Sequence, residues 1–401
     1  MNNIKVAGAF LKKNLKGDPI IWTIIFLLSI ISVLVVYSAV YAQAHVRKGG
    51  DTEYYLIKHV ILILLSFFAT WVAHNINYKY YAGISKMLLW LAVPLLLYTH
   101  FFGLNINGAS RWLSMPGGLT FQTSDLAKLA LITNLTSMLA KRQSNIDDFK
   151  KALSPVLLWC GVICGLIALS DLGTSLTLFM TCMLLMFISR VPLKQLGVLV
   201  FSGSGALFLA LALGNRLGTA ISRLTAWWDT LTGATGIASG LGYQVESSMI
   251  AMATGGFWGV GAAHSQQKYF LPEAFSDYVF AILIEEYGML IGICVLFLYL
   301  ALLYRGMKTA ANSDKAFGGL LSAGLSFSLV LQALINMAVV VGIGPVTGMP
   351  LPFISMGGTS LLFTGFSLGI ILSVSRVDEA RNHQMNTNFM SSGGGNVTKE
   401  S

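Results

Sequence analysis

The sequence predicts an all-α polytopic membrane protein with ten transmembrane helices and a large extracytoplasmic loop between helices 7 and 8. Apolar residues make up 55% of the chain and charged residues 11%, against about 45–50% and about 25% in soluble domains. Several apolar runs reach the ~20 residues that a helix needs to cross a bilayer. A long segment of weaker hydropathy, 214–277, separates the first seven runs from the last three.

Ten apolar runs define the predicted helices. In chain order they are 20–41, 56–73, 87–102, 126–140, 156–169, 172–188, 196–213, 278–304, 316–341 and 360–374. The polar, basic segment 1–19 precedes a run long enough to span, so we expect a cytoplasmic N-terminal segment without a cleavable signal. After the membrane domain, 20–376, the Gly- and Ser-rich segment 377–401 predicts a disordered cytoplasmic tail.

The polar segments between the runs are expected to lie outside the bilayer. Segment 103–124 is rich in Gly, Asn and Ser and is predicted to be a loop. Segment 214–277 holds two short apolar pieces, 245–254 and 257–263, which are too short to cross a membrane. They predict interfacial or re-entrant helices over a cavity, where broken backbone is tolerated.

The basic residues indicate the orientation. Most of the 26 Lys and Arg fall in segments that ten crossings place on the same side as the termini. The opposite loops hold only Arg47, Lys48, Arg111, Arg216, Arg223 and Lys268. The positive-inside rule therefore places both termini in the cytoplasm. It also accounts for the net charge of +9 without a nucleic-acid partner.

Acidic residues are scarce, with 17 in 401, and three lie at or in the eighth helix. Asp277 precedes it, and Glu285 and Glu286 lie inside it. An ionised group in hydrocarbon costs about 2.5–3.5 kcal/mol, so such residues usually face a protein interior or a water-filled cavity. Asp277 is either a helix cap or a cavity group, and at most one of the two glutamates is expected to share a cavity with it.

Further polar motifs lie near the external ends of other predicted helices. Asp125 and Lys128 are three residues apart and can pair on one helix face. Arg111 is either an interfacial anchor beside Trp112 or a phosphate clamp, since a guanidinium can bind two oxygens at once. Asp171 suits the N-cap of the sixth helix.

The cysteines do not predict a disulfide framework or a zinc site. All four lie in predicted spans, where a thiol usually serves packing. They are Cys160, Cys164, Cys182 and Cys294.

The order and spacing of these motifs resemble those of the SEDS proteins (shape, elongation, division and sporulation) over roughly residues 20–376. The matching motifs are Arg111-Trp112, Asp125-x-x-Lys128, Asp171-Leu172-Gly173-Thr174, Gly242-Tyr243-Gln244, Leu271-Pro272-Glu273-Ala274 with Asp277, Glu285-Glu286-x-Gly288 and Pro350-Leu351-Pro352-Phe353-Ile354-Ser355-x-Gly357-Gly358. The Leu-Pro-Glu-Ala stretch is more similar to the division branch, FtsW-like, than to the elongation branch.

The resemblance implies ten membrane helices and a peptidoglycan glycosyltransferase that polymerises lipid II. It implies an essential aspartate before the eighth helix, which matches Asp277, and functional roles for Asp125 and Lys128. Two departures bear on the second motif, because the family commonly has Glu at the position of Asp125 and Pro at that of Thr123. Any partner is expected to be a class B penicillin-binding protein, with other divisome membrane proteins, at the septum of a bacterial inner membrane.

The expected reaction assigns roles to the motif residues. A sugar hydroxyl attacks the anomeric carbon of a lipid-linked chain, and Asp277 accepts its proton. Arg111, Lys128 and Arg223 are the candidate contacts of the leaving diphosphate. The remaining expected substrate-binding residues are Asp125, Gln244, Glu273 and Ser276. A divalent cation, Mg²⁺ or Mn²⁺, could share this work, although no dedicated metal cage and no organic cofactor are predicted.

Two other functions are also compatible with the sequence. Membrane acids and bases also suit a transporter, here a lipid II flippase. The absence of a convincing internal repeat and the concentration of polar motifs on one face argue against it. The second of these functions is that of a non-catalytic scaffold for division proteins.

Overall fold

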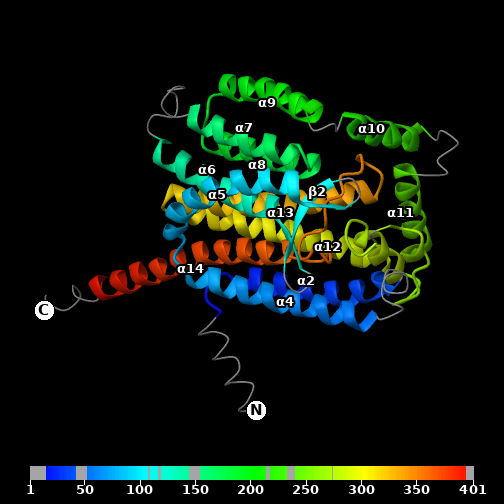
Figure 1. The fold of residues 1–401 in the computed structure, drawn as a ribbon. Coiled ribbons are helices and arrows are strands. Elements are labelled where there is room, and N and C mark those ends of the chain that lie inside the picture. The colour runs from blue at the N-terminus through cyan, green and yellow to red at the C-terminus, as the bar shows by residue number, and fades with distance from the viewer. Residues whose placement is uncertain are drawn as a thin grey trace, which may run out of the picture.

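The computed structural model shows a bundle of helices that run roughly parallel to one another (Figure 1). It describes residues 15–41, 52–106, 109–115, 119–143, 154–213, 217–232, 240–272 and 274–393. Within these ranges six helices are long and apolar enough to cross a membrane. They are α2 (Pro19–Ala39), α4 (Thr52–Asn75), α5 (Tyr81–Phe102), α12 (Val279–Asn312), α13 (Ala316–Val340) and α14 (Ser360–Gly393).

Four further helices lie in the same bundle (Figure 1). They are α6 (Thr123–Lys141), α7 (Ser154–Ala168), α8 (Leu172–Ile188) and α9 (Leu193–Leu213). Each overlaps one of the predicted spans. The helices α7 and α8 are shorter than the first six, α6 is more polar than most of them, and α9 contributes a shorter apolar stretch at Leu193–Leu209. Buried hydroxyls such as Thr133 and Thr181 donate to carbonyls of their own helix, which accommodates these hydroxyls in the interior.

The helix α13 lies at the centre of the bundle. It packs against α6, α8, α12 and α14, and most of its side chains are buried. Helices α4 and α14 form another close pair, in which Thr70 Oγ1 donates to the carbonyl of Gly365 at 2.9 Å. Small residues at this contact allow the two backbones to approach closely.

The end of the bundle near the sheet carries most of the irregular structure. A three-stranded antiparallel sheet joins α5 to α6 and consists of β1 (Leu104–Ile106), β2 (Ala109–Met115) and β3 (Leu119–Gln122). Trp112 of β2 is paired with Gln122 of β3. The loop predicted for 103–124 is therefore wrong in its described parts, because two short hairpins place the backbone polar groups in a ladder.

Between α9 and α12 the chain forms α10 (Leu217–Thr232), α11 (Leu241–Gly255) and the 3-10 turn η4 (Gln267–Tyr269). The predicted helix at 245–254 is confirmed as part of α11. The helix predicted at 257–263 is wrong, since this stretch consists of turns. Gly259 has a φ of +80° and approaches the backbone of Glu286 and Gly288, a conformation that glycine adopts readily.

The chain enters and leaves the described bundle at the same end, where α2 begins and α14 runs out (Figure 1). The helix α14 continues to Gly393, into the segment 377–401 for which the sequence predicts disorder. Arg381 pairs with Asp314, and Ser313 donates to Asp378, which attaches this part of α14 to the start of α13. Residues 394–401 lie outside the described ranges.

Candidate active site

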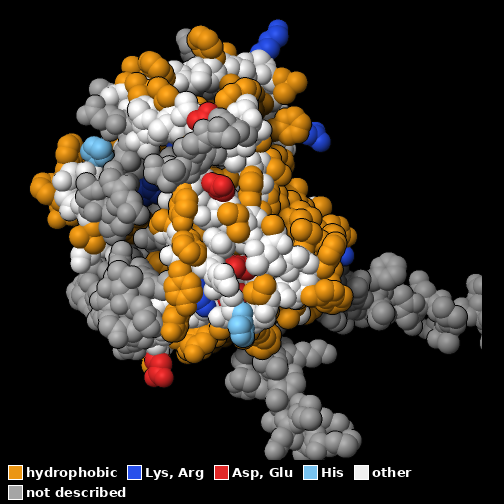
Figure 2. All heavy atoms as spheres, turned by 90° about the vertical axis from the view of Figure 1, so that its right-hand side faces the viewer, with side chains coloured by type: hydrophobic (Ala, Val, Ile, Leu, Met, Phe, Trp, Pro, Cys, Tyr) orange, Lys and Arg blue, Asp and Glu red, His pale blue; other side chains and the backbone are white. Residues whose placement is uncertain are grey.

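Asp277 lies in the turn that leads into α12. Figure 2 shows the molecule from the right-hand side of Figure 1. Charged side chains are sparse on this face. The Asp277 side chain is half-buried, and its Oδ1 accepts a hydrogen bond from Ser276 Oγ at 3.0 Å. Asn336 of α13 fixes the backbone here by donating to the carbonyls of Asp277 at 2.8 Å and Met349 at 2.7 Å. The carboxylate is thus held in place without being sealed from the surface.

The segment 344–360 forms a wall beside this carboxylate. Ser355 Oγ donates to the Ser276 carbonyl at 2.5 Å, which ties the wall to the turn. Gly348, with a φ of +69°, has space for a Cβ that would lie 3.4 Å from Asp277 Oδ2 and 3.9 Å from Arg111 Nη1. The carboxylate and the guanidinium therefore flank one small volume above this glycine.

Arg111 reaches this volume from β2. Its Nη1 lies 3.2 Å from Asp171 Oδ2, and its Nε donates to the Ser170 carbonyl at 3.1 Å. Asp171 also caps α8 by accepting from the Thr174 backbone at 3.1 Å. The predicted cap is confirmed, and the same carboxylate positions the guanidinium of Arg111.

Arg223 approaches from α10 and donates from Nη1 to the Thr347 carbonyl at 3.2 Å. A small cavity lies between the two arginines, with about 290 Å³ of space that includes space open to the surroundings. Leu172, Thr219 and Leu211 contribute to its walls. Two guanidiniums on one cavity form an arrangement that suits a phosphate-bearing ligand.

Tyr278 connects Asp277 to α11 and α10. Its hydroxyl donates to Gln244 Oε1 at 3.3 Å. Burial raises the pKa of Tyr278, the negative charge of Asp277 raises it further, and the positive charge of Arg223 lowers it. Asp277 and Arg223 therefore act on the same buried phenol, although they come from different elements.

A second polar cluster surrounds Lys128 near the start of α6. Lys128 Nζ lies 3.3 Å from Asp125 Oδ1 and donates to Gln332 Oε1 at 2.9 Å. Gln332 in turn donates to the Pro350 carbonyl at 2.9 Å. The predicted pair is confirmed, and Gln332 links it to the wall that borders Asp277.

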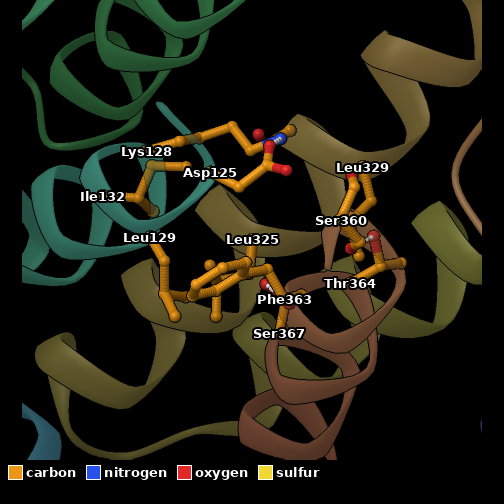
Figure 3. Close-up of a pocket in the computed structure, with 11 residues that line it drawn as sticks. Asp125, Lys128, Leu129, Ile132, Leu325, Leu329, Ser360, Phe363, Thr364 and Ser367 are labelled. Carbon is orange, nitrogen blue, oxygen red and sulfur yellow. Dashed lines mark hydrogen bonds and ion pairs between the residues drawn. The ribbon is translucent and has the colours of Figure 1, made fainter. Parts of the chain in front are cut away.

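The Asp125–Lys128 pair faces a pocket between α6, α13 and α14, shown in Figure 3. The pocket is narrow and has room for about one water molecule. Ser360 and Thr364 of α14 lie across it from Asp125. Within the described residues, Asp125 Oδ2 is buried and has no hydrogen-bond partner. This oxygen is therefore available to a ligand that enters the pocket.

The two glutamates of α12 have a different role. Ser265 Oγ donates to Glu285, and the Ser265 backbone donates to Glu286 Oε1 at 3.4 Å. Lys268 Nζ donates to the Ala263 carbonyl at 2.7 Å. Burial lowers the pKa of Lys268, and the glutamate charges oppose that shift. Both carboxylates therefore hold the segment before η4 against α12.

Five of the predicted residues converge on one region: Arg111, Arg223, Gln244, Ser276 and Asp277. Asp125 and Lys128 form the adjoining cluster, and Glu273 lies outside the described residues. Sequence reasoning missed Asn336, Gln332 and Gly348. Only the Gly348 position carried a local signal, since its Pro/Gly-rich segment predicted a rigid turn.

The described residues contain no group of three or more His, Cys, Asp or Glu that could hold a metal ion. A half-buried carboxylate beside a cavity with two arginines can still contribute one oxygen to a cation that a diphosphate also binds. The residues therefore fit a cation shared with a ligand better than a cation held by protein alone.

The fold and the site define a multi-pass helical membrane protein with a polar, cation-lined site where its helices end. The family model described as "Cell cycle protein", FtsW/RodA/SpoVE, matches residues 18–380. This chain belongs to that family.

Several named relatives resemble the chain over most of its length. A protein of Geobacter sp. (strain M18) named "Probable peptidoglycan glycosyltransferase FtsW" is 32% identical, covering 89% of this chain and 96% of the relative. The protein with the same name from Coxiella burnetii is 34% identical, covering 88% and 95%. "Stage V sporulation protein E" of Bacillus subtilis is 32% identical, covering 91% and 98%.

Solved structures share the fold. A chain from a structure described as "Structural coordination of polymerization and crosslinking by a peptidoglycan synthase complex" matches with a TM-score of 0.69, 24% identity, and coverage of 90% of this chain and 98% of that chain. The rod shape determining protein RodA of Thermus thermophilus matches with a TM-score of 0.61, 24% identity, and coverage of 90% and 97%.

Proposed function

We propose that this protein is a peptidoglycan glycosyltransferase that polymerises lipid II into glycan strands during cell division. The observation that carries the proposal is the half-buried Asp277 carboxylate, which shares the volume above Gly348 with the Arg111 guanidinium, while Arg223 binds the neighbouring Thr347 carbonyl. The names of the relatives from Geobacter and Coxiella support this reaction. The family membership supports the setting in the cell cycle.

The proposed topology has ten crossings, with α6, α7, α8 and α9 added to the six long apolar helices. Both termini then lie in the cytoplasm, and Asp277 faces the outer side of a bacterial cytoplasmic membrane. The distribution of basic residues supports this orientation. The substrate reaches the site from the outer leaflet.

Asp277 acts as the general base. A sugar hydroxyl loses its proton to Asp277 Oδ2 while its oxygen forms a bond to the anomeric carbon of the other lipid-linked sugar. The bond between that carbon and the diphosphate breaks, and the diphosphate leaves with the bonding electrons. Oδ2 lies beside Gly348, on the side that faces Arg111, so it is the oxygen assigned to the proton.

The arginines stabilise the leaving group. Arg111 is held by Asp171, and Arg223 is held by the Thr347 carbonyl, so both are fixed before the reaction begins. Fixed cations away from bulk water stabilise developing negative charge without reorganisation. Lys128, Asp125, Gln244 and Glu273 complete the proposed substrate contacts.

A divalent cation, Mg²⁺ or Mn²⁺, would supply further charge neutralisation at the diphosphate. Asp277 is the described carboxylate placed to contact it, and diphosphate oxygens would provide other ligands. In this case glycan synthesis by the purified protein is sensitive to EDTA.

A membrane-bound class B penicillin-binding protein is the proposed partner, supplying the transpeptidase step at the division septum with other divisome membrane proteins. The match to a chain from a complex described by polymerisation and crosslinking supports such a pairing.

The substitution Asp277→Asn tests the reaction. It keeps the size and polarity of the side chain but removes the base, so glycan synthesis from lipid II should fall by about 10²–10⁴-fold. The control is Asp229→Asn, an exposed acid on α10, which should leave synthesis unchanged. The measurement is a gel of glycan products from purified protein, with and without the transpeptidase partner.

The same preparation separates the alternative functions. Reconstituted vesicles in which lipid II crosses the bilayer, with no glycan product under any condition, would identify a flippase. Cells that divide normally with Asp277→Asn, provided that partner binding is retained, would instead identify a scaffold.

A further inference from the structure

A second basic cavity lies at the opposite end of α5 and α6 from Asp277. Lys86 lies near the start of α5, Lys141 ends α6, and Arg142 follows it. Trp159 of α7 completes one side. The cavity encloses about 820 Å³ of space, including space open to the surroundings. It shares no lining residue with the cavity beside Arg111.

The lining combines cations with aromatic and apolar surface. Trp90 and Trp159 meet edge to face, with ring centroids 5.0 Å apart. Leu89 and Met138 add apolar surface, and no acidic residue is among the described lining. Tryptophan is enriched at the headgroup level of membranes, so these rings indicate that the cavity opens where headgroups lie.

We propose that this cavity binds the phosphate headgroup of an anionic phospholipid from the leaflet opposite Asp277. Basic pockets between membrane helices attract such headgroups, and a guanidinium with two ammonium groups supplies the donors that phosphate requires. The buried Asn134 and Ser137 in the lining can hydrogen-bond the glycerol or ester oxygens. The tryptophans and Leu89 cover the first part of an acyl chain, a surface that free phosphate would not use.

Native mass spectrometry of the full-length protein tests the proposal with phosphatidylglycerol and phosphatidylcholine as probes. The unmodified protein should retain phosphatidylglycerol in preference to phosphatidylcholine. The variant K86Q/K141Q/R142Q should lose this preference, with affinity falling about fivefold for each cation removed. The control K194Q/K308Q/K315Q removes three exposed lysines from the same end of the bundle and should retain the preference.

Several outcomes would overturn the proposal. They are equal retention of the two lipids, undiminished phosphatidylglycerol on the K86Q/K141Q/R142Q variant, and displacement of the lipid by excess inorganic phosphate, which would identify a free-phosphate site. If the triple variant elutes as aggregate, Lys86→Gln alone, at an exposed position, should still weaken retention about fivefold. Unchanged retention by that variant also contradicts the assignment.

Discussion

Gly348 determines how much room remains beside the proposed base. A Cβ at this position would lie 3.4 Å from Asp277 Oδ2 and 3.9 Å from Arg111 Nη1. Gly348→Ala should therefore lower glycan synthesis by about tenfold or more, the effect of one misplaced methyl group in a binding site. The measurement is the rate of product formation with purified protein and lipid II.

The matched control is Gly256→Ala. Gly256 also has a positive φ, +53°, but a Cβ there meets nothing within 4 Å. Both substitutions place a Cβ on a backbone with a positive φ, and Gly256 also has a ψ of −144°, which few residues other than glycine adopt, so both should lower the melting temperature. Equal losses of activity in the two variants would show that strain, and not crowding at Asp277, is responsible.

At the scale of residues, the sequence identified the charged groups but not how they are held. Asp277 and Arg111 were predictable because charge is scarce in an apolar chain and therefore marks function. Asn336 was not predictable, because its contacts with the Asp277 and Met349 carbonyls join segments far apart in the chain. Asp171 was predicted as a cap, but its contact with Arg111 also depends on tertiary packing.

Asp171, the N-cap of α8, has two roles that substitutions can separate. Asp171→Asn keeps a cap oxygen but removes the charge opposite Arg111. We expect KM for lipid II to rise about tenfold, corresponding to the loss of one charge-assisted hydrogen bond. Asp171→Ala should lose about 1 kcal/mol more of stability, because the cap is lost as well.

Steady-state kinetics and thermal melts in detergent measure the two effects. An unchanged KM for Asp171→Asn would mean that Arg111 does not need this partner to meet the substrate.

The packing of α4 against α14 depends on a side chain of minimal size. A Cβ at Gly365 would lie 2.3 Å from Ser66 Oγ and 2.5 Å from the Ser66 carbonyl oxygen. Gly365→Ala should thus destabilise the protein by about 1–3 kcal/mol through overpacking. In the control Gly161→Ala on α7, a Cβ meets nothing within 4 Å, so the melting temperature should hold or rise. A melting temperature for Gly365→Ala at or above that of the parent would contradict this packing.

At the scale of elements, long apolar runs were predictable and short irregular elements were not. The helices α2 and α13 follow from hydropathy alone. The strands β1 to β3 have three to seven residues, too few for a clear alternation. The segment 257–263 was predicted to be helical because its residues are apolar. Its backbone conformation depends instead on the close approach of Gly259 to α12.

At the scale of the molecule, the proposed site lies at one end of the bundle, and the described chain enters and leaves the bundle at the other. The proposed site contains Asp277 of the turn before α12, Arg111 of β2 and Arg223 of α10. The helix α2 begins and α14 runs out at the end of the bundle away from β2 (Figure 1). The cavity lined by Lys86 lies at that other end as well. This separation is what a site served from one side of a membrane requires.

The proposed orientation can be measured by chemical labelling. Trp258 is 83% exposed in the segment before η4, and Lys194 is exposed in the first turn of α9, directly after the turn between α8 and α9. In a variant with the four native cysteines replaced by alanine, we expect Trp258→Cys to react with a membrane-impermeant maleimide in intact spheroplasts. Lys194→Cys should react only after the membrane is opened, because the positive-inside rule places that turn in the cytoplasm. The reverse pattern would place Asp277 on the cytoplasmic side, away from an outer-leaflet substrate, and would contradict the proposed reaction.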